Sequence, residues 1–245
     1  MWNQRTPVLT NKRTITSLLL LTLLAIAFGL IAQPTQKKGA AGSVLVADKG
    51  KLNILLDGKS VGREEFEIVP SGGNWLAKGS TSITPAQGAS SNITGSLTLQ
   101  PGGAPLTYDW TAQTEKTNGA HVVFANGVAK MTLQMQGAHS FEQDLTFGSP
   151  FIVVLDNNLY HQYAVLARVY DWSRRGSQNF SVLIPQELTP GTLSVEAVGS
   201  ATFDGKSFEG LKVQTSDLEL TLYLDNSHRL MRIEVPSAKV SVIRE

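Results

Sequence analysis

The sequence contains no cysteine among its 245 residues. This absence excludes disulfide bonds, thiol nucleophiles, zinc–thiolate sites and an N-terminal lipid-modified cysteine. About 200 residues follow an apolar N-terminal segment, and a domain of that size buries roughly 70% of the surface of its unfolded chain. We therefore expect a hydrophobic core to stabilise the domain without covalent or metal cross-links.

The chain also lacks a basic stripe. Its first 42 residues carry five basic residues and no acidic one, so the remainder, with 16 basic and 20 acidic residues, carries a net charge of −4. Nucleic-acid binding depends on clustered lysine and arginine that replace counterions. The charge distribution therefore argues against a nucleic-acid partner.

Catalytic motifs are scarce as well. The sequence has no G-x-S-x-G elbow, phosphate-binding glycine loop, H-E-x-x-H motif or dinucleotide fingerprint. The histidines are too far apart in sequence to form a local metal site: His121, His139, His161 and His228. We expect no cofactor and no metal site, and the motifs favour a protein without enzymatic activity but do not decide the point. A hydrolase that combines His161 with Asp171 or Glu142 remains a second alternative.

A long apolar run, Ile15 to Ala32, contains 18 residues without a charge and follows Lys12 and Arg13. A basic start before an apolar run is typical of a secretory signal, and 18 residues are just enough to span a bilayer. We expect residues 1–33 to form a hydrophobic helix that is either a signal peptide or a signal anchor, followed by a linker at 34–43. The protein is then exported to the periplasm or the periplasmic side of the inner membrane, and an anchored form keeps its N-terminus in the cytoplasm.

From Lys51 onward, short alternating apolar runs are separated by turn residues. Asp57-Gly58, Asn126-Gly127, Asp204-Gly205 and Asp225-Asn226 each lie between two such runs. Asn-Gly and Asp-Gly favour the tight primed turns of β-hairpins. In "LELTLYL" the four leucines 218, 220, 222 and 224 share one face of a strand, as expected for a sheet with one buried face.

These runs predict a mainly β fold. About twelve sequential antiparallel strands cannot stay flat, so we expect a curled antiparallel sheet, half-barrel or barrel-like, covered by one α-helix. No break in composition divides residues 44–245, which we expect to form a single domain. In and just after "REEFE", Glu65 and Glu67 point to one side of the strand and Glu64, Phe66 and Ile68 to the other. We interpret this charged segment as part of a solvated face of the sheet, not as a catalytic pair of carboxylates.

One segment, "DNNLYHQYAVLARVYDWSRRG", has a helical pattern. Asp156, Asn157 or Asn158 can cap its start and Gly176 can close its end, which predicts a helix over 158–174. Leu159, Tyr163, Leu166 and Tyr170 form an apolar stripe, while His161 and Arg168 form a narrow polar line on the opposite side. So narrow a polar line indicates a helix that is largely enclosed by the sheet.

This helix supplies the candidate ligand-binding residues. Aromatic and polar side chains lie together where it would cover the concave side of the sheet. The five candidates are Tyr163, Tyr170, Trp172, His161 and Arg168. We expect a binding module for an apolar or lipid-like ligand, with the membrane contacted through the N-terminal segment. The alternative is a structural or assembly partner of another envelope protein.

The C-terminal stretch "LELTLYLDNSHRLMRIEVPSAKVSVIRE" resembles the end of a group of uncharacterised exported bacterial envelope proteins, which carry an LD…RL…EVP…VIRE-like pattern. The stretch "LDGKSVGREEFEI" is similar to their opening hairpin. This resemblance implies a mainly antiparallel envelope protein and supplies no catalytic residues. The expected curled sheet with helical cover also resembles the half-barrels of periplasmic lipoprotein carriers, a likeness of fold that does not establish function.

Overall fold

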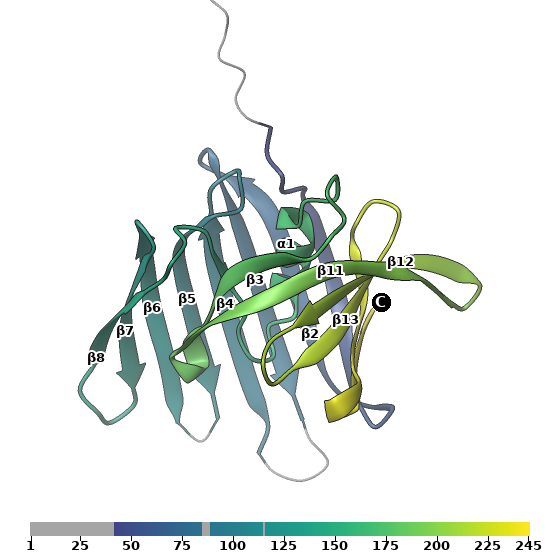
Figure 1. The fold of residues 1–245 in the computed structure, drawn as a ribbon. Coiled ribbons are helices and arrows are strands. Elements are labelled where there is room, and N and C mark those ends of the chain that lie inside the picture. Colours follow the sequence, from purple (N-terminus) through teal and green to yellow (C-terminus); the bar gives the residue numbers. More distant parts are fainter. Residues whose placement is uncertain (1–41, 85–88, 115) are drawn as a thin grey trace, which may run out of the picture. The chain divides into compact units, whose positions relative to one another are not determined.

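The computed structural model describes residues 42–84, 89–114 and 116–245. The expected N-terminal helix and most of the linker lie outside these residues. Within them, no helix is both long and apolar enough to cross a membrane. Fifteen strands form one sheet (Figure 1): β1 (Asp48–Leu56), β2 (Lys59–Ser71), β3 (Asn74–Ile83), β4 (Ser91–Leu99), β5 (Pro105–Gln113), β6 (Thr117–Ala125), β7 (Val128–Met135), β8 (Phe141–Thr146), β9 (Ile152–Val154), β10 (Gln178–Ile184), β11 (Thr189–Phe203), β12 (Lys206–Gln214), β13 (Glu219–Leu224), β14 (Leu230–Val235) and β15 (Val240–Arg244).

The strand order of the sheet is β8-β7-β6-β5-β4-β3-β2-β1-β15-β14-β13-β12-β11-β10-β9. Every neighbouring pair is antiparallel except β9 and β10, which are parallel. The first and last strands, β1 and β15, therefore pair in the middle of the sheet, with Leu52 opposite Arg244. The two edges, β8 and β9, are consecutive in the chain.

The connection between β8 and β9 shows that the sheet curls. Residues 147–151 join the two edges, and so short a connection spans at most about 20 Å. The edges must therefore approach one another, and β9 lies against β5 while the 3₁₀ turn η1 (Pro185–Glu187) lies against β6. The expectation of a mainly β, curled antiparallel sheet with one helix is confirmed (Figure 1).

The expected number of about twelve strands is too low. β9 is a three-residue apolar strand with no alternation to reveal it. The β10–β11 and β14–β15 hairpins turn through η1 and η2 (Pro236–Ala238), and the left-handed residues that follow are Leu188 and Lys239. Neither turn carries the Asn-Gly or Asp-Gly signal on which the strand count depended.

Three of the four expected hairpin turns have the required backbone. Both residues of Asp57-Gly58, Asn126-Gly127 and Asp204-Gly205 have positive φ angles, between 48° and 77°. The fourth prediction is wrong in detail, because the left-handed residue between β13 and β14 is His228, with φ of 54°. There the Asp225 carboxylate accepts hydrogen bonds from the backbone N–H groups of Ser227 and Arg229.

The helix α1 spans His161–Val169 and is shorter than the expected 158–174. Asn158 has φ of +63°, outside the helical region, and Tyr160 begins the helix without a side-chain cap. At the other end Tyr170 is extended, with ψ of 130°. The side chains that suggested a helix start bond elsewhere: the Asp156 carboxylate accepts a hydrogen bond from the Tyr108 hydroxyl, and Asn157 Nδ2 donates to Glu187.

α1 lies on the inner face of the curled sheet and contacts β3 and β14. The core fills the space between this helix and the inward-facing side chains of the strands. Its largest fully buried side chains are Tyr108, Leu52, Leu97, Leu99, Met131, Ile152, Leu159, Leu166, Leu183, Leu193, Leu211 and Leu222. In β13, Leu220, Leu222 and Leu224 are buried together as the alternation predicted, whereas Leu218, just before the strand, is 37% exposed.

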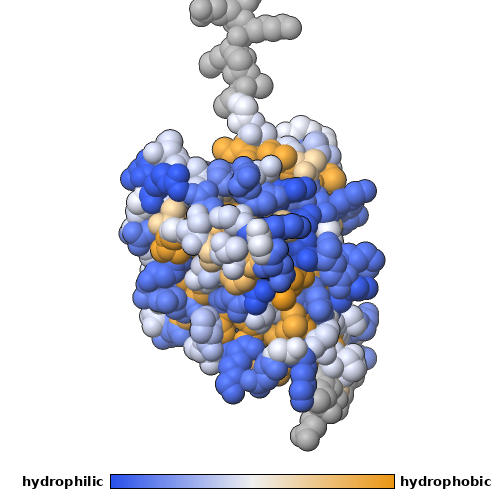
Figure 2. All heavy atoms as spheres, turned by 90° about the vertical axis from the view of Figure 1, so that its right-hand side faces the viewer, coloured by the Kyte–Doolittle hydropathy of each residue, from blue (hydrophilic) through white to orange (hydrophobic). Residues whose placement is uncertain are grey.

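The opposite face of the sheet, which we call the outer face, is solvated. Figure 2 shows one side of the domain, where hydrophilic residues cover most of the surface and apolar residues are exposed in separate patches. One-sided burial of this kind produces the alternation seen in the sequence.

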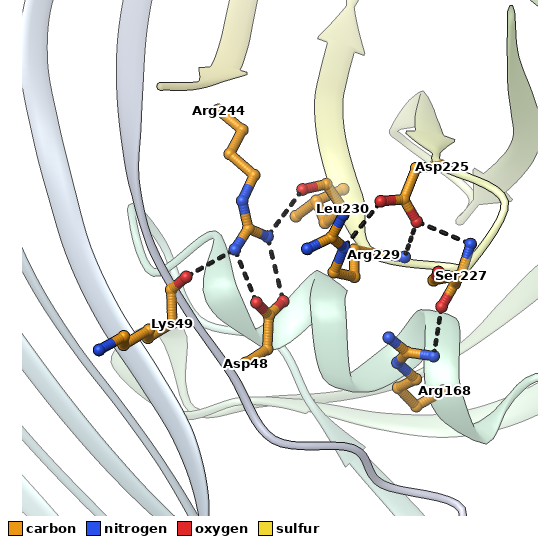
Figure 3. A network of polar contacts seen from close by, with 8 residues as sticks. All are labelled: Asp48, Lys49, Arg168, Asp225, Ser227, Arg229, Leu230 and Arg244. Atoms are coloured by element: carbon orange, nitrogen blue, oxygen red, sulfur yellow. Dashed lines mark hydrogen bonds and ion pairs between the residues drawn. The ribbon is translucent and has the colours of Figure 1, made fainter.

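A buried ion pair joins the two strands at the centre of the sheet (Figure 3). Both Nη atoms of Arg244 in β15 contact the Asp48 carboxylate of β1, at 3.0 and 2.6 Å. The guanidinium also donates to the carbonyl oxygens of Lys49 and Leu230. The Arg244 and Asp48 side chains are only 10% and 8% exposed. This pair connects β1, β14 and β15 in one network.

Candidate functional site

His161, the first residue of α1, is fully buried and paired with Glu64 of β2. Its Nδ1 lies 2.5 Å from Glu64 Oε1, and its backbone N–H donates to Glu64 Oε2 at 3.1 Å. Neither side chain is accessible to solvent. The Phe66 ring is stacked with the imidazole at 6.2 Å between centroids. The carboxylate of Glu64 therefore holds the start of α1 on the sheet.

Arg168 and Trp172 connect the other end of the helical segment to the β13–β14 turn. Arg168 Nη1 donates to the carbonyl oxygen of Ser227 at 2.6 Å (Figure 3), and partial burial lowers the pKa of this guanidinium. The Trp172 indole stacks on His228 at 4.0 Å and donates to the Ala167 carbonyl. Both side chains are engaged in contacts within the domain.

The two candidate tyrosines pack against the sheet. Tyr170 is buried, and its hydroxyl donates to the Gly176 carbonyl at 2.9 Å and accepts from the Ala197 N–H at 3.2 Å. Tyr163 is partly buried against the core, and burial raises the pKa of its hydroxyl. Four of the five sequence-predicted residues thus connect the helical segment to β2, to the β13–β14 turn and to β11, and no described cavity brings all five together.

The pairing considered for a hydrolase is not formed. His161 contacts Glu64, whereas Asp171 is exposed and accepts hydrogen bonds from Ser173. Glu142 is an exposed residue of the edge strand β8. Sequence reasoning missed Glu64, although one signal was present: it alternates with Phe66 and Ile68 and so lies on the buried face of β2.

A second buried carboxylate, Asp156, lies just before α1. It accepts hydrogen bonds from the Tyr108 hydroxyl at 2.9 Å and from the backbone N–H groups of Asn157 and Gln186. Its own N–H donates to Gln162 Oε1. Burial raises the pKa of Asp156 to about 6, and the hydrogen bonds to the carboxylate oppose that shift.

Three buried side-chain nitrogen atoms in the described residues have no hydrogen-bond partner. They are Trp110 Nε1, His161 Nε2 and Gln162 Nε2. Such groups are usually satisfied by ordered water. Within the described part of the chain, no three acidic or histidine side chains are grouped closely enough to hold a metal ion.

The outer face carries a groove of about 1000 Å³ across β1–β5. Its floor is the backbone of a row of inward-facing residues that oppose one another in successive strands: Gly50, Phe66, Gly79, Gly95 and Trp110. A Cβ at Gly79 would lie 2.4 Å from His161 Nδ1, which shows that this row faces the helix. The residues on either side of the row therefore face outward and form the groove walls.

The two walls are rows of paired residues in register. One wall contains Lys49, Glu67, Lys78, Ser96 and Asp109. The other wall contains Lys51, Glu65, Ser80, Thr94 and Thr111. The groove crosses five strands that are about 4.8 Å apart, so it is roughly 19 Å long. Its walls are two residues apart along each strand, about 6.7 Å, so it is narrow.

Ion pairs neutralise most charges of the groove. Lys51 pairs with Glu65 at 2.6 Å and Lys78 with Glu67 at 2.7 Å. Asp109 Oδ1 is 2.6 Å from His121 Nδ1 on the next strand, a contact that is an ion pair only when the imidazole is protonated. Glu245, which lines the β1 end, pairs with Arg63 at 2.5 Å. These pairs are largely exposed, and each contributes little to stability.

The β3–β5 part of the groove carries hydroxyl groups. Ser80 lies opposite Thr94, and Thr94 lies opposite Thr111, while Ser96 lies in the other wall. Sequence reasoning did not identify this surface, because its residues come from five strands and none forms a recognisable motif. Only the strand registers bring them together.

The fold is similar to that of solved β proteins. No family model matches the chain, and comparison with curated proteins gives no match. A β-barrel-like protein of Domain of Unknown Function DUF1849 from Brucella abortus is 10% identical, with a TM-score of 0.53 over 82% of this chain and 95% of that chain. A DUF1089 family protein from Pseudomonas aeruginosa is also 10% identical, with a TM-score of 0.49 over 73% and 91%.

The first likeness shows a β-barrel-like fold shared with a protein of unknown function. It agrees with the expected kind of fold. The sequence pattern by which the C-terminal stretch resembles exported envelope proteins stays a prediction.

Proposed function

We propose that the chain is an exported cell-envelope protein whose β domain binds an elongated ligand without catalysing a reaction. The groove across the outer face of β1–β5 is the observation that carries this proposal. Its volume of about 1000 Å³ is at the upper end of the range of ligand sites, about 300–1,000 Å³. The basic start and apolar run at Lys12 to Ala32 support export.

The outer groove is a better candidate than the space beneath α1. An apolar or lipid-like ligand beneath the helix would have to displace Leu159, Leu166 and Ala167, which are not exposed at all. The side chains of the groove walls, in contrast, are already in contact with solvent. We therefore place the ligand on the outer face, where no core side chain has to move.

Native lysines provide the test. Lys49, Lys51 and Lys78 line the groove, whereas Lys130 in β7 and Lys239 in the β14–β15 turn are exposed elsewhere and serve as controls. We expect acetylation by a small membrane-permeant reagent to be several-fold slower at the three groove lysines in intact envelopes than in the purified full-length chain. The two control lysines should react equally in both samples.

Equal labelling of groove and control lysines in the two samples would contradict the proposal. Slower acetylation of Lys130 and Lys239 alone in intact envelopes would also contradict the proposal, because it would place the bound ligand outside the groove. Quantitative mass spectrometry of the acetylated peptides gives the ratio for each lysine separately.

The structural alternative rests on the edge strand β8. Phe141 and Met135 are 51% and 48% exposed, and β8 pairs with β7 on one side. An unprotected edge of this kind can accept a strand from another protein. The test compares cross-linking of the wild-type chain in cells with that of a double variant, Phe141→Asp/Glu142→Lys. Loss from the variant of a partner that the wild-type chain recovers would favour this alternative, and unchanged recovery would eliminate it.

A further inference from the structure

We infer that the groove ligand is a straight oligosaccharide chain that carries a carboxylate, bound along the groove from the hydroxyls of β3–β5 to Lys49 of β1. The inference rests on the proposed function and specifies the ligand class. It follows from three properties of the groove: its hydroxyl array, its mostly paired charges, and a floor whose backbone hydrogen-bonding groups are already used in the sheet and whose aromatic rings face the core.

The hydroxyl array matches a polyhydroxylated chain. Ser80, Thr94 and Thr111 lie side by side in three adjacent strands, and Ser96 lies two residues from Thr94 on the opposite wall. Opposed residues of antiparallel strands are about 5 Å apart, so the hydroxyls form a regular grid. Each hydroxyl can donate one hydrogen bond and accept two, which suits the mixed donor and acceptor character of sugar hydroxyls.

The charged part of the groove suits the same ligand. The ion pairs of Glu65 and Glu67 each engage Oε1, which leaves Oε2 able to accept a hydrogen bond from a sugar hydroxyl. Lys49 differs from Lys51 and Lys78, because the ion pairs among the described residues give it no acidic partner. One cation therefore remains, at the β1 end, for one anionic group of the ligand.

A polypeptide is the less suitable occupant. β1–β5 lie inside the sheet, and each is paired with a strand on both sides, so their backbone groups cannot accept an added strand. The rings of Phe66 and Trp110, which are 6% and 8% exposed, face the core and offer no apolar anchor on the outer face. Recognition can then combine the side-chain hydroxyls and carboxylates with the apolar stems of the wall side chains.

The test uses two soluble probes that differ by one carboxylate. The first is the β-1,4-linked N-acetylglucosamine hexamer, a straight oligosaccharide, and the second is the same hexamer oxidised to the aldonic acid at its reducing end. Titration calorimetry with the full-length chain in a sugar-free detergent measures both dissociation constants. We expect both hexamers to bind, the acid roughly two- to fivefold more tightly, as one exposed charge contact allows.

Three variants locate the contacts. Thr94→Val should raise both dissociation constants roughly three- to tenfold by removing one hydroxyl without changing the shape of the side chain. Lys49→Gln should abolish the preference for the acid and leave the affinity for the neutral hexamer unchanged. Thr221→Val, on the outward side of β13 and outside the groove, is the matched control and should change neither value.

The outcomes separate the ligand class from the proposed function. Protection of the groove lysines in envelopes together with no binding of either hexamer at millimolar concentration would overturn the oligosaccharide and leave a groove ligand of another class. Binding that is unaffected by both Thr94→Val and Lys49→Gln would also overturn it. Absence of lysine protection would overturn the proposed function itself.

Discussion

Glu64 and His161 are 97 residues apart in the sequence and form a buried pair with Nδ1 and Oε1 2.5 Å apart. The pair is directly behind the groove floor, since a side chain at Gly79 would touch both of them. The helix inside the sheet and the groove outside it are therefore separated by one layer of backbone.

Loss of the Glu64 carboxylate should destabilise the domain. Glu64→Leu leaves the N–H groups of His161 buried without an acceptor, which should lower the free energy of unfolding by about 2–3 kcal/mol. Urea denaturation measures the change. Glu65→Leu, one residue away on the exposed face, should cost less than about 1 kcal/mol. A Glu64→Leu/His161→Leu double variant should lose less than the sum of the single variants, and strict additivity would contradict the pairing.

Two glycine substitutions test the close approach of α1 to the groove floor. A Cβ at Gly79 would lie 2.4 Å from His161 Nδ1 and 2.5 Å from Glu64 Oε1, whereas a Cβ at Gly102 would meet nothing within 4 Å. Gly79→Ala should therefore lower the free energy of unfolding by about 1–3 kcal/mol through overpacking. Gly102→Ala should leave it nearly unchanged, and equal thermal stability of the two variants would contradict the prediction.

Stability should depend on pH through Asp156. Burial raises the pKa of this carboxyl to about 6 from its ordinary 3.8, so the folded domain binds the proton more tightly than the unfolded chain does. The resulting stabilisation is complete below about pH 4 and is lost as the pH rises through 6; two pKa units amount to at most about 3 kcal/mol. Asp156→Asn cannot ionise. Its unfolding free energy should fall less between pH 5 and 8 than that of the wild type, and parallel pH profiles would refute the assignment.

The Arg244–Asp48 pair should matter far more than a surface ion pair. Arg244→Met leaves the Asp48 carboxylate buried without its cation, which should cost about 3–5 kcal/mol. Lys239→Met breaks the exposed pair with Asp57 and should cost less than about 1 kcal/mol. Chemical denaturation of both variants checks the difference, and a loss of similar size in both would contradict the importance of burial.

The sequence predicted those parts of the fold that depend on local chemistry. Alternating leucines in β13 and positive-φ turns such as Asn126-Gly127 follow from neighbouring residues alone. The helix start was misplaced because Asp156 bonds to Tyr108 and Gln186, which are distant in the sequence, instead of capping the helix.

The candidate site was less accessible to sequence reasoning. His161 was placed on the narrow polar line of the helix without a partner, because Glu64 could not be assigned to it from one sequence. Although Glu64 lies on the apolar side of β2, the alternation alone does not say which helix it meets. The groove could not be foreseen either, since it depends on the registers of five strands.

The position of β1 beside β15 has a consequence for the folding kinetics of the domain. β1 to β8 are joined by successive hairpins, as are β10 to β15, so each half can form from contacts between neighbouring segments. Pairing Leu52 with Arg244 instead closes a loop of nearly the whole domain. Long-range contacts of this kind form slowly. The pairing of β1 with β15 should therefore form last. Before that step each half would be a separate sheet, with β1 or β15 as an edge strand that is unpaired on one side.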